Sequence, residues 1–253
     1  MHRVQSIFLP YQLNHYFCRQ STLPDEQHQS LPTIPNATSI LSEIVISPQD
    51  VTYAIAAVDP SNASGPDLVS PMLIREGALF LAAPLSTYFT QHIRQSVFPS
   101  AWKLANVIPI FKKAAPSNPA NYRPISLLSC LGTLMERYVH KVLYNYLVSK
   151  DLVSPLQSGF VKGDSTNKQR TLLYNDVCKA LDDGQVRAVF CDISKAFDRI
   201  WHRGLLHKLS TLGISGSLLR FLHIYHFVNN GFHMLVPRHL GNLLTLVYLR
   251  DIF

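Results

Sequence analysis

The stretch that decides the fold is ANVIPIFKKAAPSNPANYRPISLL, which covers residues 105–128. Its two ends, 105–113 and 122–127, are rich in β-branched and aromatic residues, and the segment between them consists of Ala, Pro, Ser and Asn. Two β-prone runs separated by turn-forming residues are typical of two strands joined by a loop. The sequence therefore predicts a pair of strands, with Lys112 and Lys113 where the first strand ends.

Upstream of this stretch the sequence predicts two helices. Ser47 can cap a helix that has Pro48 at its first position, and apolar residues then recur at helical spacing. A turn-rich segment follows at 59–67, and a second apolar pattern predicts a helix over 73–89 that is broken or kinked near Pro84. A helical layer is thus expected before the strand pair.

Downstream, the periodicity predicts helices over 130–150, 171–181 and 195–212. Between the last two, the mostly apolar run at 186–192 is predicted to be a buried strand that ends in Asp192. A carboxylate held at the end of such a strand can bind Mg²⁺, although an Asp in this place can equally cap the following helix. The expected fold class is α+β.

Composition restricts the function without deciding it. Of the 253 residues 47% are apolar and 15% charged, which is enough for a buried core. The formal net charge is +7, and residues 101–150 alone contain seven Lys or Arg and one Glu. A local basic excess of this kind favours a polyanionic partner, but many basic proteins bind no nucleic acid.

Cysteine spacing and hydropathy limit the cellular context. The four cysteines lie far apart in the sequence, which disfavours a disulfide scaffold or a Cys-based zinc module and fits a reducing compartment. No uncharged stretch reaches the roughly 18 apolar residues of a spanning helix, and no signal peptide is recognised. We therefore expect no membrane partner, and the location is left open: intracellular, nuclear or cytoplasmic.

Four ordered motifs resemble the reverse transcriptase of LINE-type (non-LTR) retrotransposons. They are WK at 102–103 with VIPIFKK at 107–113, NYRPISLL at 121–128, QSGF at 157–160 and CDISKAFD at 191–198. A GPD segment at 65–67 also resembles the part of that family that leads into the fingers, so the similarity runs from about residue 47 to about residue 220.

This resemblance implies a right-hand polymerase with fingers and an incomplete palm. Before the region of similarity, the Pro, Gln and Ser content of residues 1–45 predicts a flexible leader. The domains expected after it are a helical segment leading into the fingers (46–100), the fingers (101–185), the start of the palm with the first catalytic motif (186–220) and a divergent tail (221–253). The implied partners are an RNA template, a DNA primer or RNA–DNA hybrid, and deoxynucleoside triphosphates. The oligomeric state is left open.

The resemblance also assigns residues to the metal and sugar sites. Asp192 would be the first catalytic carboxylate and would bind both Mg²⁺ ions, with the backbone carbonyl of Ile193 completing one coordination sphere. Phe197 would pack under the incoming sugar and exclude a 2′-hydroxyl, although it is equally well explained as a core aromatic of the following helix. Asp198 is expected to be structural.

In the fingers, the resemblance assigns phosphate binding to three cations and template contact to a turn. Lys112 or Lys113 and Arg123 would reach the triphosphate and the template backbone, whereas a Lys pair at a strand end is otherwise usually a solvated edge. The turn residues Gln157, Gly159 and Phe160 would contact the template, and the alternative is an ordinary turn.

One part of the family pattern is missing. A two-metal site needs more than one carboxylate, and the family supplies a later pair of adjacent Asp residues. Residues 201–253 contain a single carboxylate, Asp251. The sequence therefore predicts an incomplete active site, and a non-catalytic RNA- or DNA-binding remnant or a decayed element product are the alternatives to an active polymerase.

Overall fold

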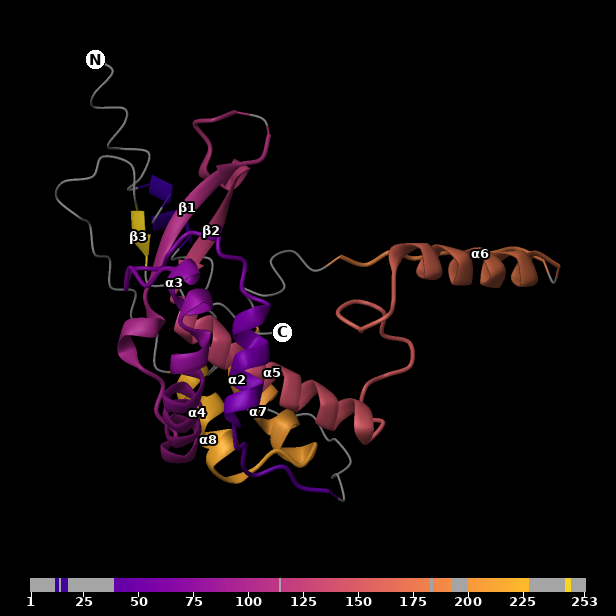
Figure 1. The fold of residues 1–253 in the computed structure, drawn as a ribbon. Coiled ribbons are helices and arrows are strands. Elements are labelled where there is room, and N and C mark those ends of the chain that lie inside the picture. The colour runs from indigo at the N-terminus through magenta and orange to yellow at the C-terminus, as the bar shows by residue number, and fades with distance from the viewer. Residues whose placement is uncertain are drawn as a thin grey trace, which may run out of the picture.

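The computed structural model describes residues 12–13, 15–17, 39–113, 115–182, 184–192, 200–227 and 244–246. Within these described residues, five helices and a shorter one form the body, with three strands above them and one further helix to the side (Figure 1). In chain order the α-helices and strands are α2 (Pro48–Ala56), α3 (Pro71–Glu76), α4 (Ala78–Gln95), β1 (Ala105–Phe111), β2 (Tyr122–Leu128), α5 (Cys130–Ser149), α6 (Thr166–Asp182), α7 (His202–Thr211), α8 (Gly216–Phe227) and β3 (Leu244–Leu246). The prediction of an α+β fold is confirmed.

The upstream helices differ from the prediction at one point. Helix α2 begins as predicted, because the Ser47 Oγ accepts from the Asp50 N–H (3.1 Å) and the Asp50 carboxylate accepts from the Ser47 N–H (3.2 Å). The break expected near Pro84 lies instead at Gly77, between α3 and α4. Pro84 deprives the Phe80 carbonyl of its helical partner, but Phe80 is 84% exposed, so water can reach that carbonyl.

Strands β1 and β2 pair antiparallel and confirm the predicted strand pair. In their register Ala105 lies opposite Leu128 and Pro109 opposite Pro124. The Lys112 N–H donates to the Asn121 carbonyl (2.8 Å), which by alternation puts both prolines at a position without ladder hydrogen bonds. Strand β3 pairs with the other edge of β1 from Ala105 to Val107. This pairing therefore stops before Pro109.

The main hydrophobic core lies among the helices. Figure 1 shows α8 beside α4 and below α5. The ring centroids of Phe98 and Tyr225 are 4.8 Å apart. The Ser96 hydroxyl, at the end of α4, donates to the Ser217 carbonyl (3.1 Å). Buried members of this core include Val51, Ile55, Phe89, Ile93, Leu134, Met135, Val139, Leu143, Leu209, Leu218, Phe221 and Leu222. Phe221, Leu222 and Tyr225, which lie at the start of the predicted divergent tail, are thus part of the core.

The folded part also begins earlier than the predicted boundary at residue 45. Leu41 forms a parallel bridge with Ile214, and the Gly213 carbonyl accepts from the Leu41 N–H (2.8 Å). Within the predicted leader, Leu13 and Phe17 are buried against Val107 of β1. Segments from both ends of the sequence therefore contribute to the packing.

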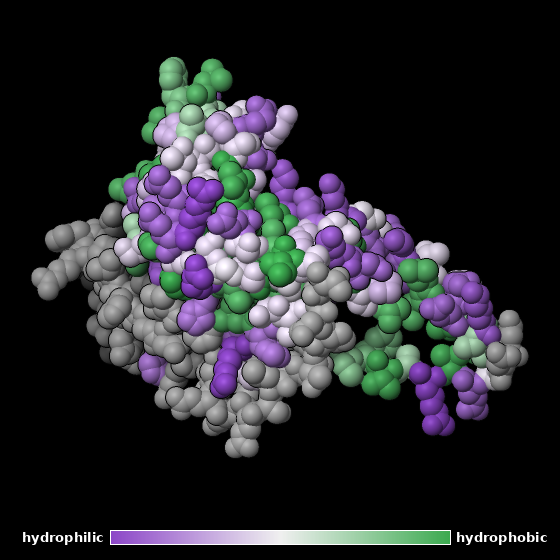
Figure 2. All heavy atoms as spheres, turned by 90° about the horizontal axis from the view of Figure 1, so that it is seen from below, coloured by the Kyte–Doolittle hydropathy of each residue, from purple (hydrophilic) through white to green (hydrophobic). Residues whose placement is uncertain are grey.

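Helix α6 lies to one side of the body (Figure 1). It starts five residues before the predicted position, because the Ser165 Oγ accepts from the Lys168 N–H (3.2 Å) and caps it. Nearly all of its described side chains are exposed, and Figure 2 shows hydrophobic and hydrophilic side chains intermixed on this arm. Leu172, Leu173 and Leu181 are among the exposed apolar side chains.

The predicted strand at 186–192 is wrong. Residues 184–192 have no regular secondary structure, and Val189 and Phe190 are 86% and 84% exposed. A buried strand requires neighbours that accept and donate its backbone hydrogen bonds. No strand in the described part of the chain pairs with this segment, so its apolar sequence alone does not make it a strand.

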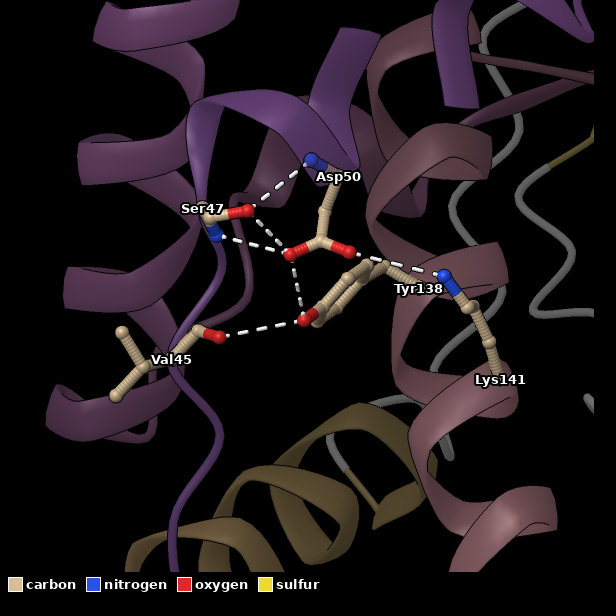
Figure 3. A network of polar contacts seen from close by, with 5 residues as sticks. All are labelled: Val45, Ser47, Asp50, Tyr138 and Lys141. Carbon is tan, nitrogen blue, oxygen red and sulfur yellow. Dashed lines mark hydrogen bonds and ion pairs between the residues drawn. The ribbon is translucent and has the colours of Figure 1, made fainter. Parts of the chain in front are cut away.

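A polar network fixes α5 against the start of α2 (Figure 3). The Tyr138 hydroxyl donates to the Asp50 carboxylate and to the Val45 carbonyl, both at 3.2 Å, and Lys141 forms an ion pair with Asp50 at 3.6 Å. The hydrogen bond from Ser47 holds the pKa of Asp50 below its usual value, whereas burial and then the Asp50 charge raise the pKa of Tyr138 to about 12.

The substitution Tyr138→Phe is expected to lower the free energy of unfolding by about 1 kcal/mol near neutral pH. Because the depressed pKa of Asp50 contributes stability above its ordinary value of 3.8, that contribution is lost as the pH falls below it. The difference between Tyr138→Phe and the original protein should therefore narrow in acid. Urea unfolding near neutral pH and below pH 3.8 measures this difference. The control is Tyr53→Phe, at an exposed position of α2. An equal loss of unfolding free energy in Tyr138→Phe and Tyr53→Phe would contradict the prediction.

None of the helices in the described part of the chain is long and apolar enough to span a membrane.

Candidate nucleic-acid interface

Three predicted cations gather at the far end of the β1–β2 hairpin. Lys112, Lys113 and Arg123 are all exposed, and Arg123 lies opposite Ile110 in the register. The hydrogen bond from Lys112 to Asn121 continues the pairing one step further. Since alternate residues of a strand share a face, Lys112 and Arg123 lie on the same face of the hairpin. The structure thus brings together the residues predicted to bind phosphate.

The loop between the strands is tied to its own ends. The Asn121 side-chain amide donates to the Ala115 carbonyl (2.9 Å), and the Tyr122 hydroxyl donates to the Pro116 carbonyl (2.9 Å). The rings of Phe111 and Tyr122 pack with their centroids 5.4 Å apart. These contacts restrict the hairpin end and so restrict the positions of the cations that it carries.

The hairpin carries charges of one sign only, which is positive. No Asp or Glu occurs in the sequence between Glu76 and Glu136, so the hairpin carries cations and no carboxylate. The nearby Lys103 is 8% exposed, and burial lowers its pKa. Lys103 therefore belongs to the base of the hairpin, whereas Lys112, Lys113 and Arg123 face solvent.

The predicted template residues share one turn. The Gln157 side-chain amide donates to the Gly159 carbonyl (3.2 Å), and Phe160, which is 80% exposed, has a φ of 62°. A Cβ added at Gly159 would meet no atom of the chain within 4 Å. The space beside Gly159 is therefore open, and nothing inside the described part of the chain requires glycine there.

The turn and the hairpin are two separate regions. Figure 1 shows the hairpin loop above the helices and the segment after α5 on the α6 side. Phe160 instead adjoins α5, where it lines an open groove together with Tyr144 and Lys162. Sequence reasoning missed the α5 side chains; the pair His140 and Tyr144, four residues apart on a predicted helix, is the signal that could have found them.

Of the predicted metal site, only Asp192 lies among the described residues. Asp192 is exposed at the end of the irregular segment 184–192 and does not terminate a strand. Ile193 and Phe197 fall outside the described residues, as does Asp198. Among the residues that are described, no three His, Cys, Asp or Glu side chains are grouped so that they could hold a metal ion.

The GPD segment has a structural role that spacing did not reveal. Asp67 accepts from the Ser129 hydroxyl (2.6 Å) and from the Val69 N–H (3.3 Å). A Cβ at Gly65 would lie 2.5 Å from the backbone carbon of Leu128. The segment therefore holds the junction between β2 and α5, and through it the orientation of the hairpin.

The sequence of this region matches a known family. The model of the reverse transcriptase (RNA-dependent DNA polymerase) family matches residues 110–236, about half of the chain. The chain belongs to this family. The match includes every residue that the resemblance assigned to nucleotide, template or metal, from Lys112 to Phe197.

Relatives in insects specify the type of reverse transcriptase. The chain is 34% identical over 173 residues to the RNA-directed DNA polymerase from mobile element jockey and 32% identical over 166 residues to the probable RNA-directed DNA polymerase from transposon BS, both of Drosophila melanogaster. It is 28% identical over 132 residues to the Pol polyprotein from type-1 retrotransposable element R2 of Popillia japonica. The resemblance to non-LTR retrotransposon reverse transcriptases is confirmed.

These matches cover only part of each relative. The jockey and BS alignments cover 65% of this chain and 18% of each relative, so the chain spans less than a fifth of their length. The family match continues to residue 236 and so includes the first part of the segment predicted to be a divergent tail (221–253). The reverse transcriptase family consists of metal-dependent polymerases that use a nucleic-acid template and nucleotide substrates.

Proposed function

We propose that this reverse transcriptase chain comprises the fingers and the first part of the palm of a non-LTR retrotransposon polymerase. The single observation that carries the proposal is the hairpin end, where Lys112, Lys113 and Arg123 gather without a carboxylate between them. Lys supplies a point charge and Arg a two-pronged donor for phosphate oxygens. In this function the hairpin binds the triphosphate of a deoxynucleotide and the backbone of an RNA template.

The proposed metal chemistry uses Asp192 and the Ile193 carbonyl. Oxygen donors of this kind suit Mg²⁺, which in a two-metal site stabilises the attacking and leaving oxygens of phosphoryl transfer. Phe197 is proposed to pack under the sugar, and Gln157 and Gly159 to contact the template beside Phe160. Support for these roles comes from the family match that contains all of these residues.

One carboxylate does not complete this site. Because a two-metal centre needs further carboxylate ligands, we expect the 253-residue chain alone to bind template without extending a primer. The alternative, a non-catalytic RNA- or DNA-binding remnant, keeps the hairpin contacts and makes no use of Asp192. The two differ in whether Asp192 takes part in binding metal and nucleotide.

Primer extension tests this proposal. The purified chain is incubated with an RNA template, a DNA primer, Mg²⁺ and all four deoxynucleotides, beside Asp192→Ala, and template binding is followed at two salt concentrations. The expected result is salt-sensitive binding with no extension in either protein. Extension that Asp192→Ala abolishes would show a complete site assembled with another copy, and absence of binding would reject the proposed function.

A further inference from the structure

Helix α6 has an apolar side that the described part of the chain leaves uncovered. Figure 1 shows this helix to one side of the body, and no other described helix or strand packs along it. Residues four positions apart lie on one side of a helix, so Leu173, Val177 and Leu181 form a continuous line, which we call the α6 stripe. Leu173 and Leu181 are 49% and 56% exposed, and Tyr174 at the edge of the stripe is 72% exposed. The α6 stripe is therefore an apolar surface open to a partner.

The sequence of α6 is poorly suited to a helix that stands alone. Nine of its 17 residues are Thr, Asn, Tyr, Asp, Val or Cys, which have a low intrinsic helix propensity. Isolated helices of about 15 residues are marginal in water, and most helices in proteins are stabilised by packing of their apolar side. The Ser165 cap and an ion pair between Lys168 and Asp164 at 3.8 Å support only the first turn. A partner that covers the α6 stripe would supply the missing stabilisation.

The charges along α6 oppose the dipole of the helix itself. Residues 166–170 contain Lys168 and Arg170 and no acidic residue, whereas residues 176–183 contain three Asp and one Lys. A helix carries a partial positive charge at its N-terminus and a partial negative charge at its C-terminus, so this order of charges destabilises a single helix. In an antiparallel pair of identical helices, the basic end of each copy lies beside the acidic end of the other. The charge pattern is thus complementary to a second, antiparallel copy of itself.

The cation beside the α6 stripe selects the same orientation. Arg170 lies three residues before Leu173, on the same side of the helix. In a parallel pair, Arg170 would lie opposite the Arg170 of the second copy, and the two like charges would repel each other. In an antiparallel pair centred on Tyr174, Arg170 lies instead at the level of Cys178, toward the acidic end of the second copy. Charge complementarity therefore identifies both the partner and its direction.

We propose that α6 binds the α6 helix of a second copy of this chain, antiparallel, through the α6 stripe. The inference goes beyond the proposed function and assigns the oligomeric state that the sequence left open. A single pair of helices buries less than the roughly 1,200 Å² of a stable protein–protein interface. The dimer is therefore expected to form with a micromolar or weaker dissociation constant.

Sedimentation velocity over a concentration series of the 253-residue chain, without nucleic acid, measures this association. The original protein should shift from monomer to dimer as its concentration rises. Leu173→Gln and Leu181→Gln should each weaken the dimer about tenfold or more, because each copy loses one buried leucine. Gln is about as good a helix former as Leu, so circular dichroism should show an unchanged helix content.

Leu172→Gln is the matched control for the two stripe variants. Leu172 is 47% exposed, nearly the same as its neighbour Leu173 at 49%. It lies about 100° around the helix from Leu173 and faces away from Val177 and Leu181. The same chemical change outside the α6 stripe should leave the dissociation constant unchanged.

Two charge-reversal variants test the complementarity of the helix ends. Lys168→Glu with Arg170→Glu makes both ends acidic, and Asp176→Lys with Asp182→Lys makes both ends basic. Each change places charges that suit the helix dipole, so loss of association cannot be ascribed to a weaker helix. Each variant alone should remain a monomer at concentrations where the original protein dimerises. An equal mixture of the two variants should recover the dimer.

Three results would overturn the proposal. A monomer at every concentration of the original protein would leave the α6 stripe to a different protein partner. Equal weakening by Leu172→Gln and Leu173→Gln would show that the copies associate through another surface. Charge-reversal variants that each associate as the original protein does would exclude the antiparallel pairing. None of these results changes the proposed function, which the primer-extension and template-binding experiment tests separately.

Discussion

Replacing Gly65 with alanine is expected to lower the free energy of unfolding by at least about 2 kcal/mol. The added Cβ would lie 2.5 Å from the Leu128 carbon and 2.6 Å from the Ser129 nitrogen, and both are backbone atoms that no side-chain rotation can move away. The segment must shift, which disturbs the 2.6 Å hydrogen bond from Ser129 to Asp67. Ser129 is fully buried and caps α5, so the start of that helix is disturbed as well.

Chemical denaturation followed by circular dichroism measures this effect, and Gly159→Ala is the matched control. A Cβ at Gly159 meets nothing within 4 Å, so the control should unfold at nearly the same denaturant concentration as the original protein. If Gly65→Ala and Gly159→Ala have equal stabilities, the GPD segment does not hold the junction between β2 and α5.

Exchanging Lys112, Lys113 and Arg123 together for glutamine is expected to weaken binding to an RNA template by about 100-fold at low salt. Each cation that neutralises a phosphate releases a counterion, and the slope of log affinity against log salt should fall by about 0.7 for each contact with a single strand. The three side chains are exposed, so their exchange should leave the stability nearly unchanged. Salt titrations of anisotropy give both the affinity and the slope.

A charge-matched triple variant on α6 is the control for this experiment. Lys168→Gln, Arg170→Gln and Lys179→Gln remove the same net charge from exposed positions on the helix that lies away from the hairpin (Figure 1). Only a small loss of affinity is expected from it. If both triple variants lose affinity equally, the binding reflects the net charge of the chain, and the hairpin is not the template site.

Local chemistry explains the parts of the fold that the sequence predicted well. The start of α2 depends on Ser47 and Asp50, which are three residues apart, and the two strands depend on β-prone runs on either side of a turn-rich loop. Helix α5 follows from apolar residues at helical spacing. Interactions of this kind lie within one helical turn or one hairpin, so a single sequence contains them in readable form.

The predicted elements differ from the structure for two reasons. Some helix boundaries had a capping or glycine signal in the sequence that was overlooked, and one predicted strand had a sequence pattern that is not sufficient to form a strand. The Ser165 cap that starts α6 was present in the sequence, and so was Gly77, at which α3 and α4 separate. By contrast, the apolar run at 186–192 carries a strand pattern, yet backbone pairing requires a neighbouring strand that the pattern itself does not supply.

The sequence by itself determined the family, the strand pair and the cations at its end, because these are ordered motifs and short-range patterns. Only the tertiary structure decided that Gly65 lies against the backbone of Leu128, that the side chains of α8 complete the core of α4 and α5, and that Phe160 and Tyr144 line one groove. Those contacts join residues far apart in the chain. Their geometry follows from how the helices pack, which no pattern within a single segment records.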